Sequence, residues 1–164
     1  MKTLYLVRHA KSSWDSPTLR DFDRPLSERG KTDAPRMGQR LHKRGVAPEL
    51  ILSSPARRAR STARKIAREI NYDLYQIQFA DNLYHATPDT ILQILSRLPD
   101  SFQSVMVVGH NPELTDFVNE YMGVRIDNVP TCGVVAARFK VQSWKELSSV
   151  AGELIFFDYP KQEI

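Results

Sequence analysis

The sequence has little cysteine and no long apolar run. A single cysteine, Cys132, excludes an internal disulfide and any zinc site built from several thiolates. No apolar run approaches the roughly 18 residues of a membrane span, and residues 1–9 contain no small-residue cleavage site of the kind that ends a signal peptide. We therefore expect a protein without a membrane role that stays in the cytoplasm, where thiols are kept reduced.

The sequence also lacks internal repeats, low-complexity tracts and a nucleic-acid-binding motif. Its net charge is +4, but much of the positive excess lies in one stretch, residues 57–68. Such a stretch fits an anionic small-molecule site or an acidic protein partner better than nucleic acid. The 41% hydrophobic and 26% charged residues are typical of a soluble globular protein, and 164 residues suit one domain covering 1–164.

Short apolar runs alternate with helical patterns along the chain. Strands are expected at 3–7, 50–52 and 104–108, and helices are expected up to Gly45 and over 55–70. This alternation predicts an α/β fold in three layers, in which helices cover both faces of a mostly parallel sheet.

The remaining segments complete this plan. Residues 133–139 and 152–158 look like closing strands, antiparallel at one edge because the link between them is short for a crossover helix. Asn111 and Pro112 suit the N-cap and first position of a further helix, and Pro35 should kink the first helix or mark its true start. The polar residues 12–24 form a long loop, which in a compact domain is often functional.

Chemically active side chains follow three of the expected strands. The first strand ends in Arg8 and His9, the second runs into residues 53–58, and the third ends before His110. The carboxyl ends of parallel strands share one edge of a sheet, where ligands bind. Guanidinium groups bind phosphate oxygens in pairs and stay charged, so this edge predicts a phosphate-binding site. The helix that begins after Asn111 adds its positive end.

One arginine of the basic stretch can be separated from the others. At 100° per residue, Arg57 and three later arginines share one direction on the helix, opposite the apolar stripe that contains Ile66. That row is expected to face solvent. Arg58 lies about 100° away from Arg57 in the first turn, where its side chain can turn toward the strand ends. We therefore expect Arg58 to be the phosphate ligand of this helix.

Four ordered motifs resemble those of the histidine phosphatase superfamily, whose fold is phosphoglycerate mutase-like. Arg8-His9-Ala10 resembles the Arg-His-Gly signature, residues 54–63 resemble the second arginine motif, and Gly109-His110 resembles the second histidine motif. The segment from Arg24 to Gly30 is similar to the SixA-type phosphohistidine phosphatases in particular. Together these similarities span nearly the whole chain.

The resemblance implies a set of roles. His9 attacks phosphorus and becomes a transient phosphohistidine, while Arg8, Arg58 and protonated His110 hold the three equatorial oxygens. Arg24 is an accessory oxygen ligand from the loop. Lys11, Ser12 and Trp14 shape the rim of the site. The further substrate-binding candidates are Lys11, Ser12, His85 and Asn111. No metal or other cofactor is required, because the arginines supply the positive charge.

The resemblance also indicates a substrate class. In relatives that cleave esters, a glutamate that protonates the leaving group falls near residues 83–85, where this sequence has no carboxylate. An alkoxide needs that proton, whereas the nitrogen of a phosphoramidate can leave already protonated. Phosphohistidine, carried by a histidine-phosphorylated protein domain, is therefore the expected substrate. Small phosphate esters remain an alternative if His85 or Asp81 replaces the glutamate.

Other classes of protein are weighed against this interpretation. The segment from Cys132 to Arg138 matches the C-x5-R pattern of cysteine-dependent phosphatases, but it reads as a strand that would hold the two residues roughly 20 Å apart at about 3.3 Å per residue. A metal site on His9, His85 and His110 conflicts with the arginines nearby. A non-catalytic phosphohistidine-binding module and a phosphomutase are further alternatives, which phosphate release would distinguish from a phosphatase.

Overall fold

A mixed six-stranded sheet lies at the centre of the computed structural model, which describes residues 1–162. The strands follow the order β3-β2-β4-β1-β5-β6. Parallel pairs join β3, β2, β4 and β1, and antiparallel pairs join β1 to β5 and β5 to β6. Their bounds are β1 Lys2–Arg8, β2 Leu50–Ser53, β3 Gln78–Phe79, β4 Ser104–Gly109, β5 Val134–Phe139 and β6 Glu153–Asp158. The predicted mostly parallel sheet with an antiparallel edge is confirmed.

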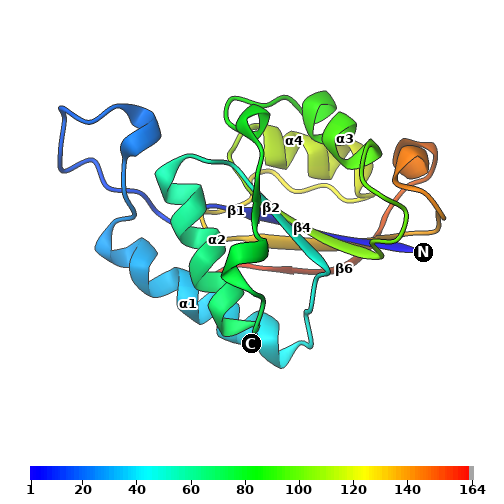
Figure 1. Ribbon diagram of the computed structural model, residues 1–164, viewed down its shortest axis with the longest axis horizontal. Helices are drawn as coiled ribbons and strands as arrows, with labels where there is room; N and C mark the ends of the chain where they lie inside the picture. Colours follow the sequence, from blue (N-terminus) through cyan, green and yellow to red (C-terminus); the bar gives the residue numbers. More distant parts are fainter. Residues whose placement is uncertain (163–164) are drawn as a thin grey trace.

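Two pairs of helices cover the two faces of this sheet (Figure 1). The first pair is α1 (Glu28–Lys43) and α2 (Arg57–Glu69), and the second is α3 (Pro88–Ser96) and α4 (Glu113–Tyr121). Short 3-10 helices complete the described elements: η1 Asp21–Asp23, η2 Leu74–Gln76, η3 Asp81–Leu83 and η4 Trp144–Ser149. The three layers are as predicted. Among the described residues, no helix is long and apolar enough to cross a membrane.

Each helix pair buries its own apolar cluster against the sheet. Met37 of α1 and Ile66 of α2 belong to one cluster, and Leu95 of α3 and Phe117 of α4 belong to the other. Because both faces are covered, the central strands are apolar on both sides, as the continuous run of β4 indicated. The two clusters fix the sheet from both sides, so the ends of its strands form a stable frame for a site.

We expected Pro35 either to kink the first helix or to mark its start. The second expectation is wrong, because Pro35 lies inside α1. Helix α1 begins at Glu28, where the Ser27 hydroxyl oxygen accepts a hydrogen bond from the Gly30 amide at 3.2 Å and caps the helix. The helix continues past the proline because Met37 and Leu41 beyond it are buried in the core. Burial of the apolar face thus outweighs the one hydrogen bond that proline cannot donate.

Helix α4 begins one residue later than predicted. Pro112 occupies the N-cap position and Glu113 is the first helical residue. The Asn111 side chain still satisfies the first turn, since its Oδ1 accepts hydrogen bonds from the Thr115 amide at 3.1 Å and the Thr115 hydroxyl at 3.0 Å. Asn111 therefore acts on the helix from one position further out than an N-cap.

Candidate active site

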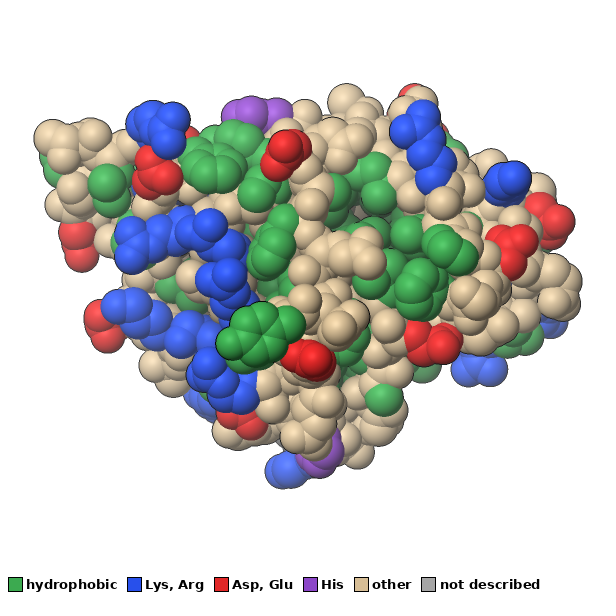
Figure 2. All heavy atoms as spheres, in the orientation of Figure 1, with side chains coloured by type: hydrophobic (Ala, Val, Ile, Leu, Met, Phe, Trp, Pro, Cys, Tyr) green, Lys and Arg blue, Asp and Glu red, His purple; other side chains and the backbone are tan. Residues whose placement is uncertain are grey.

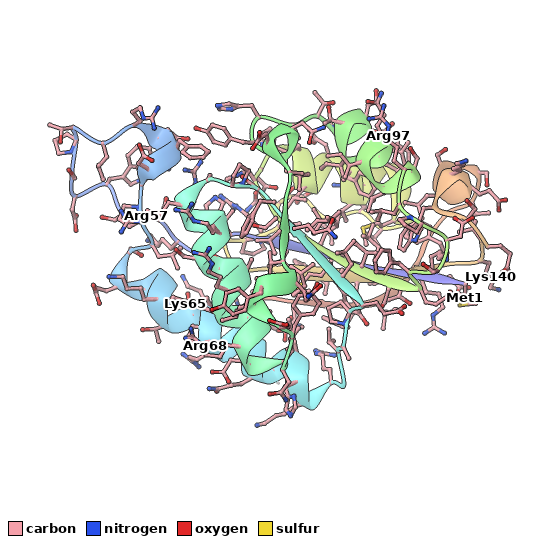
Figure 3. The ribbon with its side chains drawn as sticks, viewed as in Figure 1. Met1, Arg57, Lys65, Arg68, Arg97 and Lys140 are labelled. Atoms are coloured by element: carbon pink, nitrogen blue, oxygen red, sulfur yellow. The ribbon has the colours of Figure 1, made fainter. Side chains whose placement is uncertain are left out.

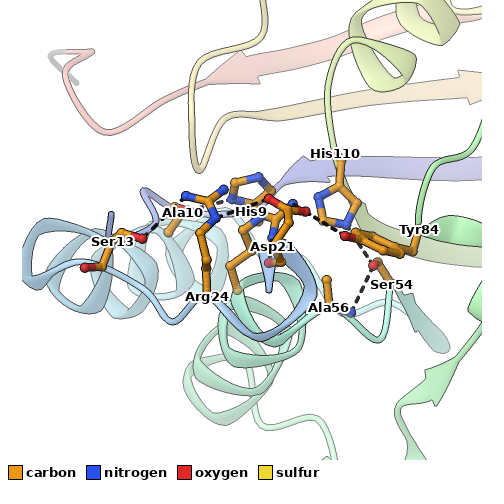
Figure 4. A network of polar contacts seen from close by, with 10 residues as sticks. His9, Ala10, Ser13, Asp21, Arg24, Ser54, Ala56, Tyr84 and His110 are labelled. Carbon is orange, nitrogen blue, oxygen red and sulfur yellow. Dashed lines mark hydrogen bonds and ion pairs between the residues drawn. The ribbon is translucent and has the colours of Figure 1, made fainter. Parts of the chain in front are cut away.

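The carboxyl ends of three parallel strands lie side by side, as the sequence predicted. Arg8 at the end of β1 is in register with Gly109 of β4, and Ser53 at the end of β2 is in register with Val108 of β4. A pocket of about 350 Å³ opens at this edge. It is lined by Arg8, His9, Lys11, Ser12, Trp14, Arg24, Arg58, His110, Asn111 and Thr131. Figure 4 shows part of its polar network.

This pocket brings together all the predicted site residues except one. His85 lies instead in an adjoining pocket of about 330 Å³. The two pockets share Arg58, His110 and Asn111, so they lie next to each other. The His85 backbone has a φ of 60°, and its ring stacks on that of Tyr84 with 4.0 Å between the centroids. This contact holds His85 at the outer side of the site.

His9 is buried and has a defined tautomer. Its Nδ1 lies 2.7 Å from the carbonyl oxygen of Ala10, which can only accept, so Nδ1 carries the proton and Nε2 keeps its lone pair. Burial lowers the pKa of His9 to about 4; the Ala10 carbonyl opposes this, and the nearby arginines Arg58, Arg8 and Arg24 lower it further. At neutral pH, His9 is therefore an uncharged imidazole with a free nitrogen lone pair.

Asp21 holds two of the arginines in place. Arg58 donates from Nη1 to the Asp21 backbone oxygen at 2.7 Å and from Nη2 to Asp21 Oδ2 at 3.0 Å. Arg24 donates from Nε to Asp21 Oδ1 at 3.2 Å, and its guanidinium lies 3.4 Å from the centre of the Trp14 ring. The loop after β1 is thereby tied to α2 beside His9.

The burial of Arg58 agrees with its predicted position away from the solvent-facing row of arginines on α2. Arg58 is buried in the first turn of α2, whereas Arg57, Arg64 and Arg68 of the same helix are exposed. Figure 3 shows Arg57, Lys65 and Arg68 along the outer side of α2, and Figure 2 shows the basic side chains gathered over this part of the surface. Only Arg58 of this helix reaches the pocket lining.

The surroundings of His110 favour its neutral form at neutral pH, whereas the resemblance implies a protonated His110 when phosphate is bound. Its Nε2 lies 2.8 Å from the Ser54 hydroxyl oxygen, and its ring centroid lies 5.1 Å from that of His9. Burial lowers the pKa of His110 to about 3, and His9 and Arg58 lower it further. A phosphoryl dianion in the pocket would act in the opposite direction and raise this pKa.

Three buried nitrogen atoms of the site have no hydrogen-bond partner within residues 1–162. They are Nε of Arg8, Nε of Arg58 and Nδ1 of His110. An unsatisfied buried donor costs about 1–3 kcal/mol, so proteins normally provide it with a partner. The Nε groups of Arg8 and Arg58 can only donate, so their lack of a partner on side chains that line one cationic pocket favours an anionic ligand. His110 Nδ1 donates in the tautomer in which the Ser54 hydroxyl donates to Nε2.

Sequence reasoning missed several residues of the site. Tyr84 donates to Asp21 Oδ2 at 2.6 Å. Partial burial acts to raise the pKa of Asp21, but hydrogen bonds from Tyr84 and Arg58 outweigh it and hold this pKa at about 2. Glu113 is buried at the start of α4 and lines the outer pocket with His85. In the sequence, only the spacing of these residues could have pointed to the site: Asp21 precedes Arg24 by three residues, and Glu113 follows His110 by three.

The two rival chemistries find little support in the geometry. Cys132 is fully buried, burial raises the pKa of its thiol, and Arg138 lies exposed within strand β5, so the two do not form a phosphate loop. The described part of the chain contains no group of three or more histidine, cysteine or carboxylate side chains that could hold a metal ion.

Comparison with known proteins defines the class. A family model described as the histidine phosphatase superfamily (branch 1) matches residues 4–85, and an uncharacterized chloroplastic protein of Arabidopsis thaliana is 32% identical over 160 residues, which cover 92% of this chain and 72% of that protein. The chain belongs to the histidine phosphatase superfamily.

Solved structures narrow the resemblance within that class. A candidate SixA phosphohistidine phosphatase from Agrobacterium tumefaciens is 31% identical and has a TM-score of 0.82, with 97% of this chain and 98% of that chain covered. A protein histidine phosphatase SixA complexed with tungstate shares the fold at 21% identity and a TM-score of 0.77, covering 96% of this chain and 97% of that one.

Proposed function

We propose that this phosphatase hydrolyses its substrate through a covalent phosphohistidine on His9. The observation that carries the proposal is the buried His9, whose Nδ1 faces the Ala10 carbonyl oxygen so that Nε2 keeps its lone pair, in a pocket lined by Arg8, Arg24, Arg58 and His110. A nucleophile must be deprotonated to attack, and the burial that lowers the pKa of His9 keeps it so at neutral pH.

The chemistry follows from the charges around the pocket. Nε2 of His9 attacks phosphorus in line with the bond to the leaving group, and that bond breaks. Arg8, Arg58 and His110 bind the equatorial oxygens, where negative charge collects in the loose transition state. Arg24 supports this binding from the loop, while Lys11 and Ser12 shape the rim. Water then attacks the phosphorylated His9 and releases inorganic phosphate.

Phosphohistidine on a protein domain is the substrate we propose. Two features support it: the likeness to the candidate SixA phosphatase of Agrobacterium tumefaciens, and the lack of a carboxylate at residues 83–85. There, Leu83 is buried in the core, and Tyr84 is bound to Asp21. A small-molecule phosphate ester is the second candidate, and a specific observation favours it: the buried Glu113 lines the pocket next to the phosphate site.

A substrate panel tests this proposal. Wild-type protein is given a phosphorylated histidine-containing transfer domain, an aryl phosphate and several alkyl phosphates, and phosphate release and isomerisation are measured for each. The proposal expects phosphate release, with the highest kcat/KM for the phosphorylated domain. Tight binding without release would identify a phosphohistidine-binding module, isomerisation would identify a mutase, and preference for one ester would identify a small-molecule phosphatase.

A further inference from the structure

Glu113 is a buried carboxyl group for which the proposed mechanism has no use. It is the first residue of α4, three positions after His110, and only 6% of its surface is exposed. Buried glutamates are rare unless they are paired. Glu113 makes no salt bridge within 4.0 Å to any of residues 1–162.

The pocket that Glu113 lines adjoins the phosphate pocket. Its wall contains Arg58 and His110, which also line the phosphate pocket, together with Tyr84 and His85. A phosphoryl group bound between Arg58 and His110 therefore has its remaining substituent near this second space. The ring of Tyr84 contacts those of His110 and His85, with centroids 5.7 Å and 4.0 Å away, and supplies an aromatic wall.

The protonation of Glu113 agrees with this position. Burial raises the pKa of its carboxyl group, although hydrogen bonds from the backbone amides of Glu113 and Ala86 and the charge of His85 act in the opposite direction. Asp116, on the next turn of α4, raises it further. Groups of both signs thus face Glu113. Because the net effect raises its pKa, the Glu113 carboxyl group keeps its proton to a higher pH than a free glutamate does, as a general acid requires.

We propose that Glu113 is the proton donor to the leaving group. This inference rests on the proposed function, because it assigns a role in phosphoryl transfer through His9. It places the acid on α4, after the second histidine, rather than at residues 83–85, where the sequence has no carboxylate. The substrates that need such an acid are phosphate esters with a basic leaving oxygen, so this assignment extends the substrate class beyond phosphohistidine.

The proton balance closes over the two steps. As the bond from His9 Nε2 to phosphorus forms and the bond to the leaving oxygen breaks, the Glu113 proton passes to that oxygen and the alcohol leaves neutral. In the second step the Glu113 carboxylate accepts a proton from the attacking water, whose oxygen bonds to phosphorus as the bond to His9 breaks. Phosphate leaves, His9 is again neutral and Glu113 is again protonated.

A leaving-group series on Glu113→Gln tests the assignment. Values of kcat/KM are measured for aryl and alkyl phosphates of increasing leaving-group pKa, with Glu120→Gln, an exposed position on the same helix, as the matched control. Glu113→Gln should lower the rate on alkyl phosphates by about 100-fold or more and leave activated aryl phosphates nearly unchanged. The basic limb of the pH profile on alkyl phosphates should also disappear in this variant.

Each other outcome has a definite meaning. If Glu113→Gln slows all esters equally, the residue only supports the packing of α4 against the Ala86 turn, and the proposal is overturned. It is also overturned if wild-type protein hydrolyses aryl phosphates but not alkyl phosphates, or if the variant retains the wild-type alkyl-to-aryl ratio. Activated aryl phosphates report the proposed function separately: if His9→Ala still hydrolyses them, the covalent mechanism itself is wrong.

Discussion

At the residue scale, burial sets the charge of the two histidines. The pKa of His9 is lowered to about 4 and that of His110 to about 3, in each case first by burial and then by neighbouring cationic or imidazole groups. Both shifts point the same way, so the pocket holds two neutral rings among charged arginines. A dianion is then attracted by the guanidinium groups without having to displace a proton from the nucleophile.

The first prediction concerns pH and activity. Because the His9 pKa is lowered to about 4, kcat/KM should fall in acid around pH 4, after correction for ionisation of the substrate. An aryl phosphate assayed between pH 3.5 and 8 measures this limb. A loss of activity centred near pH 6.5, the ordinary histidine value, would contradict the burial argument.

The same shifts predict how stability depends on pH. Between pH 6.5 and about 4 the unfolded chain binds protons at His9 and His110 that the folded protein does not bind. The free energy of unfolding should therefore be fully retained above pH 6.5 and fall as the pH drops toward 4. Thermal unfolding across this range should show a shallower decline for His110→Gln, and an identical slope in that variant would contradict the assignment.

The third prediction compares two adjacent arginines. Arg58→Ala removes a ligand of the transferring phosphoryl group, so kcat/KM should fall by about 100-fold or more for every substrate alike. Arg57→Ala is the matched control, since Arg57 is exposed on the same turn, about 100° around the helix from Arg58, and should leave activity close to wild type. Equal losses in the two variants would mean that the positive charge of α2 acts as a whole.

At the scale of elements, the helix α1 packs closely against the loop that carries Lys11. A Cβ atom on Gly30 would overlap the Lys11 carbonyl group, which accepts hydrogen bonds from the Ser27 amide at 2.9 Å and the Ser27 hydroxyl at 3.1 Å. Glycine at this point therefore permits the close approach that sets the rim of the site.

The fourth prediction follows from this approach. Gly30→Ala should push the Lys11 segment outward, which lowers the unfolding free energy by about 1–3 kcal/mol and reduces kcat/KM. Gln39→Ala, on the exposed side of α1, is the control and should change neither quantity. Thermal unfolding and an aryl phosphate assay measure the two effects. Wild-type kinetics in Gly30→Ala would show that the rim is independent of α1.

The elements with a strong apolar pattern could be predicted, and those set by tertiary contacts could not. The central strand β4 is continuously apolar, and α2 separates buried Ile66 from exposed Arg57, so period and composition sufficed. The short strand β3 was missed because its two exposed residues carry no signal. Helix α3 was also missed, although Thr87 at its N-cap and Pro88 at its start are typical of a helix N-terminus. Pro35 misled because its local cost is small compared with burial of α1.

At the scale of the whole molecule, the parallel sheet assembles the site from distant segments. The adjacent ends of β1, β2 and β4 explain why residues 8, 58 and 110 could be grouped from the sequence. The contacts of Asp21 and Glu113 could not be foreseen, since they depend on how the loop after β1 and the start of α4 fold over that edge. Strand topology is visible in the sequence, whereas side-chain contacts across loops are not.

The fifth prediction is that turnover needs no metal ion. The arginines around His9 supply the positive charge that a divalent cation would otherwise provide, and they would repel such a cation from the pocket. Phosphate release should be unchanged after prolonged incubation with excess chelator. A loss that added magnesium or zinc restores would contradict this account of the charges.

Trapping the phosphorylated enzyme tests the central claim most directly. Protein mixed with radiolabelled aryl phosphate is quenched in alkali within milliseconds, digested and mapped by mass spectrometry; a parallel sample is quenched in acid, in which phosphohistidine is labile. The account predicts phosphate on His9 in the alkaline sample, none after acid treatment and none in His9→Ala, with Cys132→Ser behaving as wild type. Phosphate on Cys132 or a carboxylate, or full turnover by His9→Ala, would contradict it.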